Sequence, residues 1–157
     1  QALRAALDAA VAELGPIEVL QHSPVPAKEF MKPVLETTAE DLRGPVEQSV
    51  LAPVTAVQHV LPGLRELGRG TILLINGSSA VTPNGNVTGT SIAFAGESAY
   101  GQMLHDALAP EGIHVAQLII PGGLDGSDGK TTVAAAGPLW DLHMGRDRFR
   151  LQIGKDV

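Results

Sequence analysis

Three apolar runs of strand length, separated by long helical stretches, constrain the fold of this chain more than any other feature. The runs are "IEVL" at 17–20, "GTILLIN" at 70–76 and "IHVAQLII" at 113–120. The spacing of apolar residues predicts helices at about 3–14, 46–67, 91–109 and 131–145. Strands joined by helical crossovers run parallel, and a parallel sheet needs helices on both faces. The sequence therefore predicts an α/β fold with a doubly wound parallel sheet.

Smaller patterns complete the predicted element order. At 148–153, Phe149, Leu151 and Ile153 alternate with Arg148, Arg150 and Gln152. This alternation predicts a fourth, half-exposed strand. Pro53 and Pro62 predict a kink or a break in the helix at 46–67. Thr38 and Asp41 resemble a capping box that opens a short helix.

Composition narrows the class of protein. A chain of 157 residues is long enough for one domain, 1–157, and its net charge of −6 argues against nucleic acid as a partner. No apolar run approaches the roughly 18–20 residues that span a bilayer, and no signal peptide is visible, so we expect a soluble, cytoplasmic protein with no membrane partner. Because the chain has no cysteine, any catalysis uses oxygen or nitrogen groups, or a cofactor.

The segments that follow the predicted strands are the places to look for a site. In doubly wound sheets the ligand crevice lies at the carboxyl ends of the strands. Here those segments follow Leu20, Asn76 and Ile120, and all of them carry Gly, Ser or Pro.

Four segments carry a family resemblance: "LGPIEVL", "AVQHVLPGL", "GRGTILLINGSSA" and "LAPEGIHVAQLIIPGG". In this order they resemble the second half of a short-chain dehydrogenase/reductase. The resemblance implies a Rossmann-type fold that binds NAD or NADP. It also implies that the glycine-rich phosphate loop belongs to an N-terminal βαβ portion that is not in this sequence, so we expect the chain to be the C-terminal portion of such a domain.

The resemblance also assigns roles to residues. Ser79, with Ser78 as the alternative, matches the serine that contacts the substrate carbonyl. The family's tyrosine and lysine, which share one helical face at i and i+4, fall on Thr90 and Phe94. Neither residue can perform that proton transfer, because a threonine hydroxyl is a far weaker acid than a phenol and Phe94 carries no charge. In the family, the loop at Pro121, Gly122 and Gly123 passes the nicotinamide carboxamide.

Plainer interpretations stand beside these roles. Ser79 also fits a turn residue at a strand end, and residues 121–123 also fit an ordinary turn. "GNVTGT" at 85–90 is a weaker candidate for phosphate binding, because it lacks the lysine of a P-loop. Among the five histidines only His22 follows a predicted strand directly enough to suggest a functional role. Tyr100, ten residues beyond Thr90, is predicted to be packing.

Two functions from different classes follow. The first is an NAD(P)-dependent oxidoreductase of divergent short-chain type, acting on a small carbonyl or alcohol substrate. The second is a non-catalytic dinucleotide-binding or scaffold protein that kept the fold and lost the proton relay. The family also implies a homodimer or homotetramer formed through the helices near 46–67 and 91–109. Small residues there would let two helices approach closely: Ala93, Ala95, Gly96, Ser98, Ala99 and Gly101.

Overall fold

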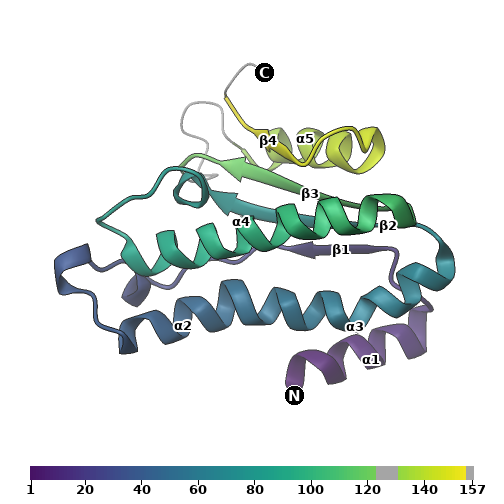
Figure 1. Ribbon diagram of the computed structural model, residues 1–157, viewed down its shortest axis with the longest axis horizontal. Coiled ribbons are helices and arrows are strands. Elements are labelled where there is room, and N and C mark those ends of the chain that lie inside the picture. The colour runs from purple at the N-terminus through teal and green to yellow at the C-terminus, as the bar shows by residue number, and fades with distance from the viewer. Residues whose placement is uncertain (123–130, 155–157) are drawn as a thin grey trace.

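The computed structural model describes residues 1–122 and 131–154 and contains one four-stranded sheet (Figure 1). The strands are β1 (Val19–His22), β2 (Gly70–Gly77), β3 (Ile113–Ile120) and β4 (Arg150–Gln152). Their order in the sheet is β1-β2-β3-β4, and each neighbouring pair is parallel. The predicted α/β fold with a parallel sheet is confirmed.

Helices connect the strands as the sequence predicted. The helices are α1 (Ala2–Leu14), α2 (Arg43–Val46), α3 (Ala52–Leu67), α4 (Thr88–Leu108) and α5 (Thr132–Gly145). A π-helical turn, η4 (Glu47–Leu51), joins α2 to α3, so the predicted helix at 46–67 is continuous rather than broken. Pro53 has no N–H to donate to the Ser49 carbonyl, and the π-helical turn lies at that point.

The two faces of the sheet bury two separate apolar clusters. Residues of α3 and α4 cover one face, where Leu20, Ile72, Leu74 and Val115 pack. The helix α5 covers the other face, where Leu73, Ile75, Ala116 and Leu118 pack. This alternation follows from the period of two in a strand. Residues of even number in β1 and β2, and of odd number in β3, therefore face α3 and α4.

Two strand predictions need correction. The strand β1 begins two residues later than predicted and includes His22, because its bounds are set by pairing with Thr71–Leu74 of β2. Phe149 packs in the cluster under α4, whereas Leu151 and Ile153 pack in the cluster under α5. These three residues thus do not share one face, because Phe149 precedes β4 and does not follow its alternation.

The predicted capping box forms at the start of a short 3-10 turn, η3 (Glu40–Leu42). The Thr38 N–H donates to Asp41 Oδ2 at 2.9 Å, and the Asp41 N–H donates to Thr38 Oγ1 at 3.4 Å. Lys32 Nζ donates to Asp41 Oδ1 at 2.6 Å, and this bond together with those from Thr38 lowers the pKa of the Asp41 carboxyl to about 2. In the described part of the chain, no helix has both the length and the apolar character needed to cross a membrane.

Candidate active site

Ser79 and Thr90 lie at the carboxyl-end edge of the sheet. Ser79 belongs to a 3-10 turn, η5 (Ser78–Ala80), that directly follows β2, and it is 9% exposed. Thr90 lies in the first turn of α4, which packs against η5. Its side-chain Oγ1 is buried and has no hydrogen-bond partner among the described residues. A buried polar atom without a partner costs free energy, and a hydrogen bond to a water molecule or to a ligand would offset that cost.

Phe94, at the position of the family's lysine, is part of the core. It is 4% exposed and forms a small apolar cluster with Ala80 and Ile119. A charged side chain could not occupy this place without losing its hydration. The position that the resemblance assigned to the lysine therefore holds an apolar core residue.

The loop after β3 is described only at its first two residues. Pro121 is half-buried, and Gly122 is exposed with a φ of +75°. A Cβ added at Gly122 would meet no atom of the described residues within 4 Å. The third residue assigned to this loop, Gly123, lies outside the described residues.

The alternative phosphate site at 85–90 is closed. Thr88 and Gly89 belong to α4, and the Thr88 N–H already donates to the Lys32 carbonyl at 3.0 Å. A Cβ at Gly89 would lie 2.9 Å from the Phe30 carbonyl oxygen, so another backbone segment covers this helix start. Because phosphate needs free N–H groups and space, the geometry does not support the alternative.

A buried carboxylate lies one helical turn beyond Phe94. Glu97 of α4 is 0% exposed, and both of its oxygens are held by strand residues. His22 Nδ1 lies 2.6 Å from Glu97 Oε1, and Asn76 Nδ2 donates to Glu97 Oε2 at 2.7 Å. A buried carboxyl group is tolerated only when it is hydrogen-bonded, as it is here.

The hydrogen bonds continue across the sheet under α4. Gln117 Nε2 donates to Asn76 Oδ1 at 2.8 Å. Gln117 Oε1 accepts from Ser98 Oγ at 3.0 Å and from Arg150 Nε at 2.8 Å, and Arg150 Nη2 donates to Ser98 Oγ at 2.8 Å. We call these six residues the polar belt: His22, Glu97, Asn76, Gln117, Ser98 and Arg150.

Strand register explains why residues so distant in sequence meet. His22 pairs with Leu74, Leu74 with Gln117, and Gln117 with Arg150. Asn76 lies on the same face, one pleat nearer the carboxyl end of β2. Each of the four strands thus contributes one polar side chain to the belt. Helix α4 packs over these side chains and contributes Glu97 and Ser98.

Sequence reasoning singled out His22 but missed Glu97. It placed His22 in a loop, whereas His22 is the last residue of β1. The signal for Glu97 was present: it is the only charged residue in the helical segment "SIAFAGESAYG" at 91–101. A lone carboxylate among small and apolar residues is either exposed or paired inside the fold.

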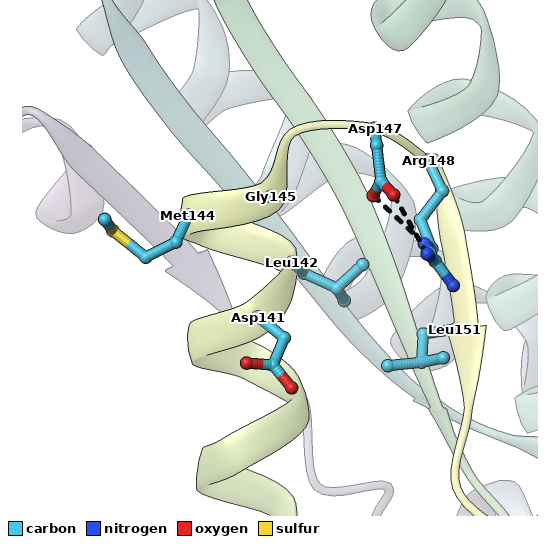
Figure 2. A pocket seen from close by; sticks show the side chains of 7 residues that line it. All are labelled: Asp141, Leu142, Met144, Gly145, Asp147, Arg148 and Leu151. Atoms are coloured by element: carbon cyan, nitrogen blue, oxygen red, sulfur yellow. Dashed lines mark hydrogen bonds and ion pairs between the residues drawn. The ribbon is translucent and has the colours of Figure 1, made fainter.

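One hollow lies away from this edge. Figure 2 shows a hollow of about 430 Å³ between α5 and the segment leading into β4, where Asp147 and Arg148 pair with each other at 2.9 Å. It is lined by Asp141, Leu142, Met144, Gly145, Asp147, Arg148 and Leu151. Because Arg148 precedes β4, this hollow lies toward the amino ends of the strands. The carboxyl-end edge remains the candidate site.

The structure resembles known short-chain dehydrogenases. It matches a short-chain dehydrogenase from Rhodopseudomonas palustris with a TM-score of 0.76 and 26% identity over 98% of this chain and 69% of that one. A short-chain dehydrogenase from Streptomyces avermitilis matches with a TM-score of 0.76 and 21% identity, over 98% of this chain and 67% of that one.

A third match is also a short-chain oxidoreductase. It is an NADPH-bound short-chain oxidoreductase from Pseudomonas aeruginosa PAO1 that contains an atypical catalytic center. Its TM-score is 0.68, with 24% identity over 75% of this chain, and this chain spans only 45% of its length. No protein-family model and no curated protein sequence matches the chain. The chain nevertheless has the Rossmann-type fold of the short-chain dehydrogenases/reductases.

Proposed function

We propose that the chain belongs to an NAD(P)-dependent oxidoreductase that interconverts a carbonyl compound and its alcohol. The observation that carries the proposal is the buried Thr90 Oγ1, which has no hydrogen-bond partner among the described residues. It lies on α4, which packs against the turn that holds Ser79 at the carboxyl-end edge of a short-chain dehydrogenase-like sheet. An orphaned hydroxyl there is suited to a bound polar group, and ligands of such sheets bind at this edge.

The described residues fit a nicotinamide group at this edge. Among the described residues, none comes within 4 Å of a Cβ built on Gly122, so none of them blocks a planar ring and its carboxamide there. Ser79 and Thr90 would hold the carbonyl oxygen through their hydroxyls. NAD or NADP, when bound, would supply the hydride, and the protein would supply orientation and the proton.

A second function, a dinucleotide-binding protein without catalysis, is favoured by one observation. Phe94 is built into an apolar cluster with Ala80 and Ile119, where the family places a charged residue. Such a protein would bind the cofactor without transferring hydride. Fold alone does not distinguish the two functions.

The experiment is a titration of the intact protein with NADH and NADPH, followed by turnover assays on a panel of ketones and aldehydes. We expect saturable binding of at least one cofactor and its oxidation by at least one carbonyl compound. Binding without turnover on any compound would favour the second function. No binding of either cofactor at millimolar concentration would overturn both.

A matched pair of glycine variants tests whether the cofactor binds beside Gly122. Gly122→Ala and Gly15→Ala both place a side chain on a backbone of positive φ, +75° and +87°, with no described atom within 4 Å of the added Cβ. Gly15, with a ψ of −168°, lies in a region that is essentially restricted to glycine, so backbone strain alone cannot explain an effect that is confined to Gly122. We expect Gly122→Ala to weaken cofactor binding at least tenfold and Gly15→Ala to leave it unchanged. Equal effects would place the cofactor elsewhere.

A further inference from the structure

The chain holds two Asn-Gly pairs in opposite surroundings. Asn76 and Gly77 end the strand β2, where the Asn76 side chain is 2% exposed and bonded to Glu97 and Gln117. Asn84 and Gly85 lie in the loop between β2 and α4, in a stretch, 81–86, whose residues are all exposed. An exposed asparagine side chain is accessible to water and to the backbone that follows it.

A hydrogen bond folds the Asn84 side chain back over the next peptide. The Asn86 N–H donates to Asn84 Oδ1 at 3.0 Å, which forms an Asx turn. The Val87 N–H donates to the Asn84 carbonyl at 3.1 Å and closes a β-turn around Gly85 and Asn86. The side-chain carbon Cγ is thereby held beside the Asn84–Gly85 peptide, whose N–H donates to no described residue.

This arrangement favours attack of the Gly85 nitrogen on Asn84 Cγ. Because glycine has no Cβ, no side chain of its own shields that nitrogen. As the N–Cγ bond forms, negative charge develops on Oδ1, to which the Asn86 N–H already donates. A donor placed in advance at a developing oxyanion stabilises the transition state.

We propose that Asn84 is a site of spontaneous deamidation, with water as the only other reactant. A solvent base takes the Gly85 N–H proton as the N–Cγ bond forms, and the Cγ–NH₂ bond then breaks and releases ammonia. Water opens the cyclic imide that results. Addition of water at Cγ gives aspartate, and addition at the former Asn84 carbonyl carbon gives isoaspartate. The reaction does not depend on the proposed oxidoreductase function.

The two products differ in their effect on the start of α4. The hydrogen bonds of Asn84 use its N–H, its carbonyl and Oδ1, and aspartate keeps all three groups. In isoaspartate the main chain runs through Cγ and is one carbon longer. The former carbonyl, which accepts from Val87 N at 3.1 Å and from Ser91 Oγ at 3.0 Å, becomes a side-chain carboxylate. Isoaspartate therefore loosens the loop from the helix that carries Thr90.

The other two asparagines of the chain are internal controls. The intact protein is incubated at mildly alkaline pH, folded or unfolded in urea, and peptide mass spectrometry follows the conversion of each amide to an acid. In the folded protein we expect conversion at Asn84 alone. Asn76 is protected by burial, and Asn86 is protected because the β-branched Val87 follows it. In urea, Asn76 should convert as well.

A folded protein that keeps Asn84 as an amide, while both Asn-Gly pairs convert in urea, would overturn the proposal. Conversion of Asn86 as fast as Asn84 would also overturn it, because exposure alone would then explain the result.

Gly85→Ala tests the attacking nitrogen. A Cβ there would meet Val34 Cγ1 at 3.6 Å, an ordinary contact, so we expect the variant to fold, which circular dichroism checks. It should lose the Asn84 amide at least about tenfold more slowly, a rise of about 1.4 kcal/mol in the barrier. Loss at the wild-type rate would exclude the Gly85 nitrogen as the nucleophile and overturn the proposal.

The effect of each product is read from thermal unfolding. Asn84→Asp should keep the wild-type midpoint, because it keeps the hydrogen bonds of the loop. The isoaspartate form, separated from incubated wild-type protein by ion exchange, should unfold at a lower temperature. Equal midpoints for the two forms would overturn the assigned effect on α4.

Discussion

Tyr100, the only tyrosine in the chain, occupies a packing position. It is half-buried against the apolar cluster under α3 and α4, and this burial raises the pKa of its phenol. It lies ten residues beyond Thr90 on α4, which at 1.5 Å per residue is roughly 15 Å along the helix. A phenol at that distance cannot reach a carbonyl held beside Ser79.

Tyr100→Phe should therefore leave turnover and cofactor binding nearly unchanged. Its stability cost should not exceed about 1 kcal/mol, the usual net value of one hydrogen bond. Steady-state kinetics beside Ser79→Ala on the same substrate, with urea unfolding, check both statements. A hundredfold loss of kcat in Tyr100→Phe with binding intact would show that the tyrosine is the catalytic acid.

His114 makes stability depend on pH. It is 6% exposed, and its Nε2 has no partner within the described ranges 1–122 and 131–154. Burial, followed by the nearby Arg146 guanidinium and His105, lowers the pKa of His114 below its ordinary value. Between the folded pKa and the unfolded value near 6.5, the unfolded chain binds more protons than the folded one. The folded state therefore loses stability as pH falls below about 6.5.

His114→Gln removes this dependence. The free energy of unfolding of the wild type should decline more steeply from pH 7 to pH 5 than that of the variant, by at most about 1.4 kcal/mol per pH unit for one proton. Denaturant unfolding at several pH values gives both slopes. Parallel slopes would mean that His114 titrates alike in both states.

At the scale of elements, the packing of α4 on the sheet depends on Gly101. A Cβ there would lie 2.5 Å from Leu74 Cδ1 and 3.2 Å from the Phe149 ring. Gly101→Ala should therefore destabilise the fold by about 1–3 kcal/mol, despite alanine's better helix propensity. Gly63→Ala in α3 is the matched control, because its Cβ would meet only Pro16 at 4.0 Å. That variant should gain about 0.5–1 kcal/mol, and urea unfolding that ranked Gly101→Ala as the more stable would refute the packing argument.

Helices and strands were predicted correctly where the pattern of neighbouring residues alone determines them. The long apolar runs placed β2 and β3 within one residue of their ends, because buried strands of a parallel sheet are apolar throughout. The strand β1 begins and ends two residues later than predicted, because pairing with β2, and not the short run at 17–20, sets its bounds. Phe149 was assigned to the wrong face because a residue just before a short strand is positioned by the core it meets.

The polar belt shows why the site was harder to predict than the sheet. Glu97 lies 75 residues from His22 and 21 from Asn76 in sequence, and only register brings them together. A family template also directs attention to Thr90 and Phe94, the positions where this chain differs. The strand ends could be located from the sequence, but the hydrogen-bonded chain across them required the fold.

At the scale of the whole molecule, α4 presents two different faces. One face is buried in the fold and includes Ala93, Phe94, Glu97, Ser98 and Gly101. Of the small residues predicted to contact a partner, Ala93, Ser98 and Gly101 are therefore not available at the surface. The outward face carries a stripe at helical spacing formed by Ile92, Ala95, Ala99 and Met103. Ile92 is 47% exposed and Met103 is 62% exposed. In Figure 1 this helix lies in front of the sheet beside the stretch that leads from α2 to α3.

We propose that this stripe, with the exposed Leu51 of the adjoining η4, forms the contact of a homodimer or homotetramer. A two-fold axis would place the stripe against its own copy, where small Ala95 and Ala99 allow close approach and Ile92 and Met103 lose exposed apolar area. Ala95→Glu should then yield monomers, because like charges would meet across the axis in a desolvated contact. Val133→Glu is the control, since Val133 is 81% exposed on α5, away from the stripe. Light scattering on the intact protein gives the masses: a monomeric wild type, or dissociation by both variants alike, would remove the stripe as the interface.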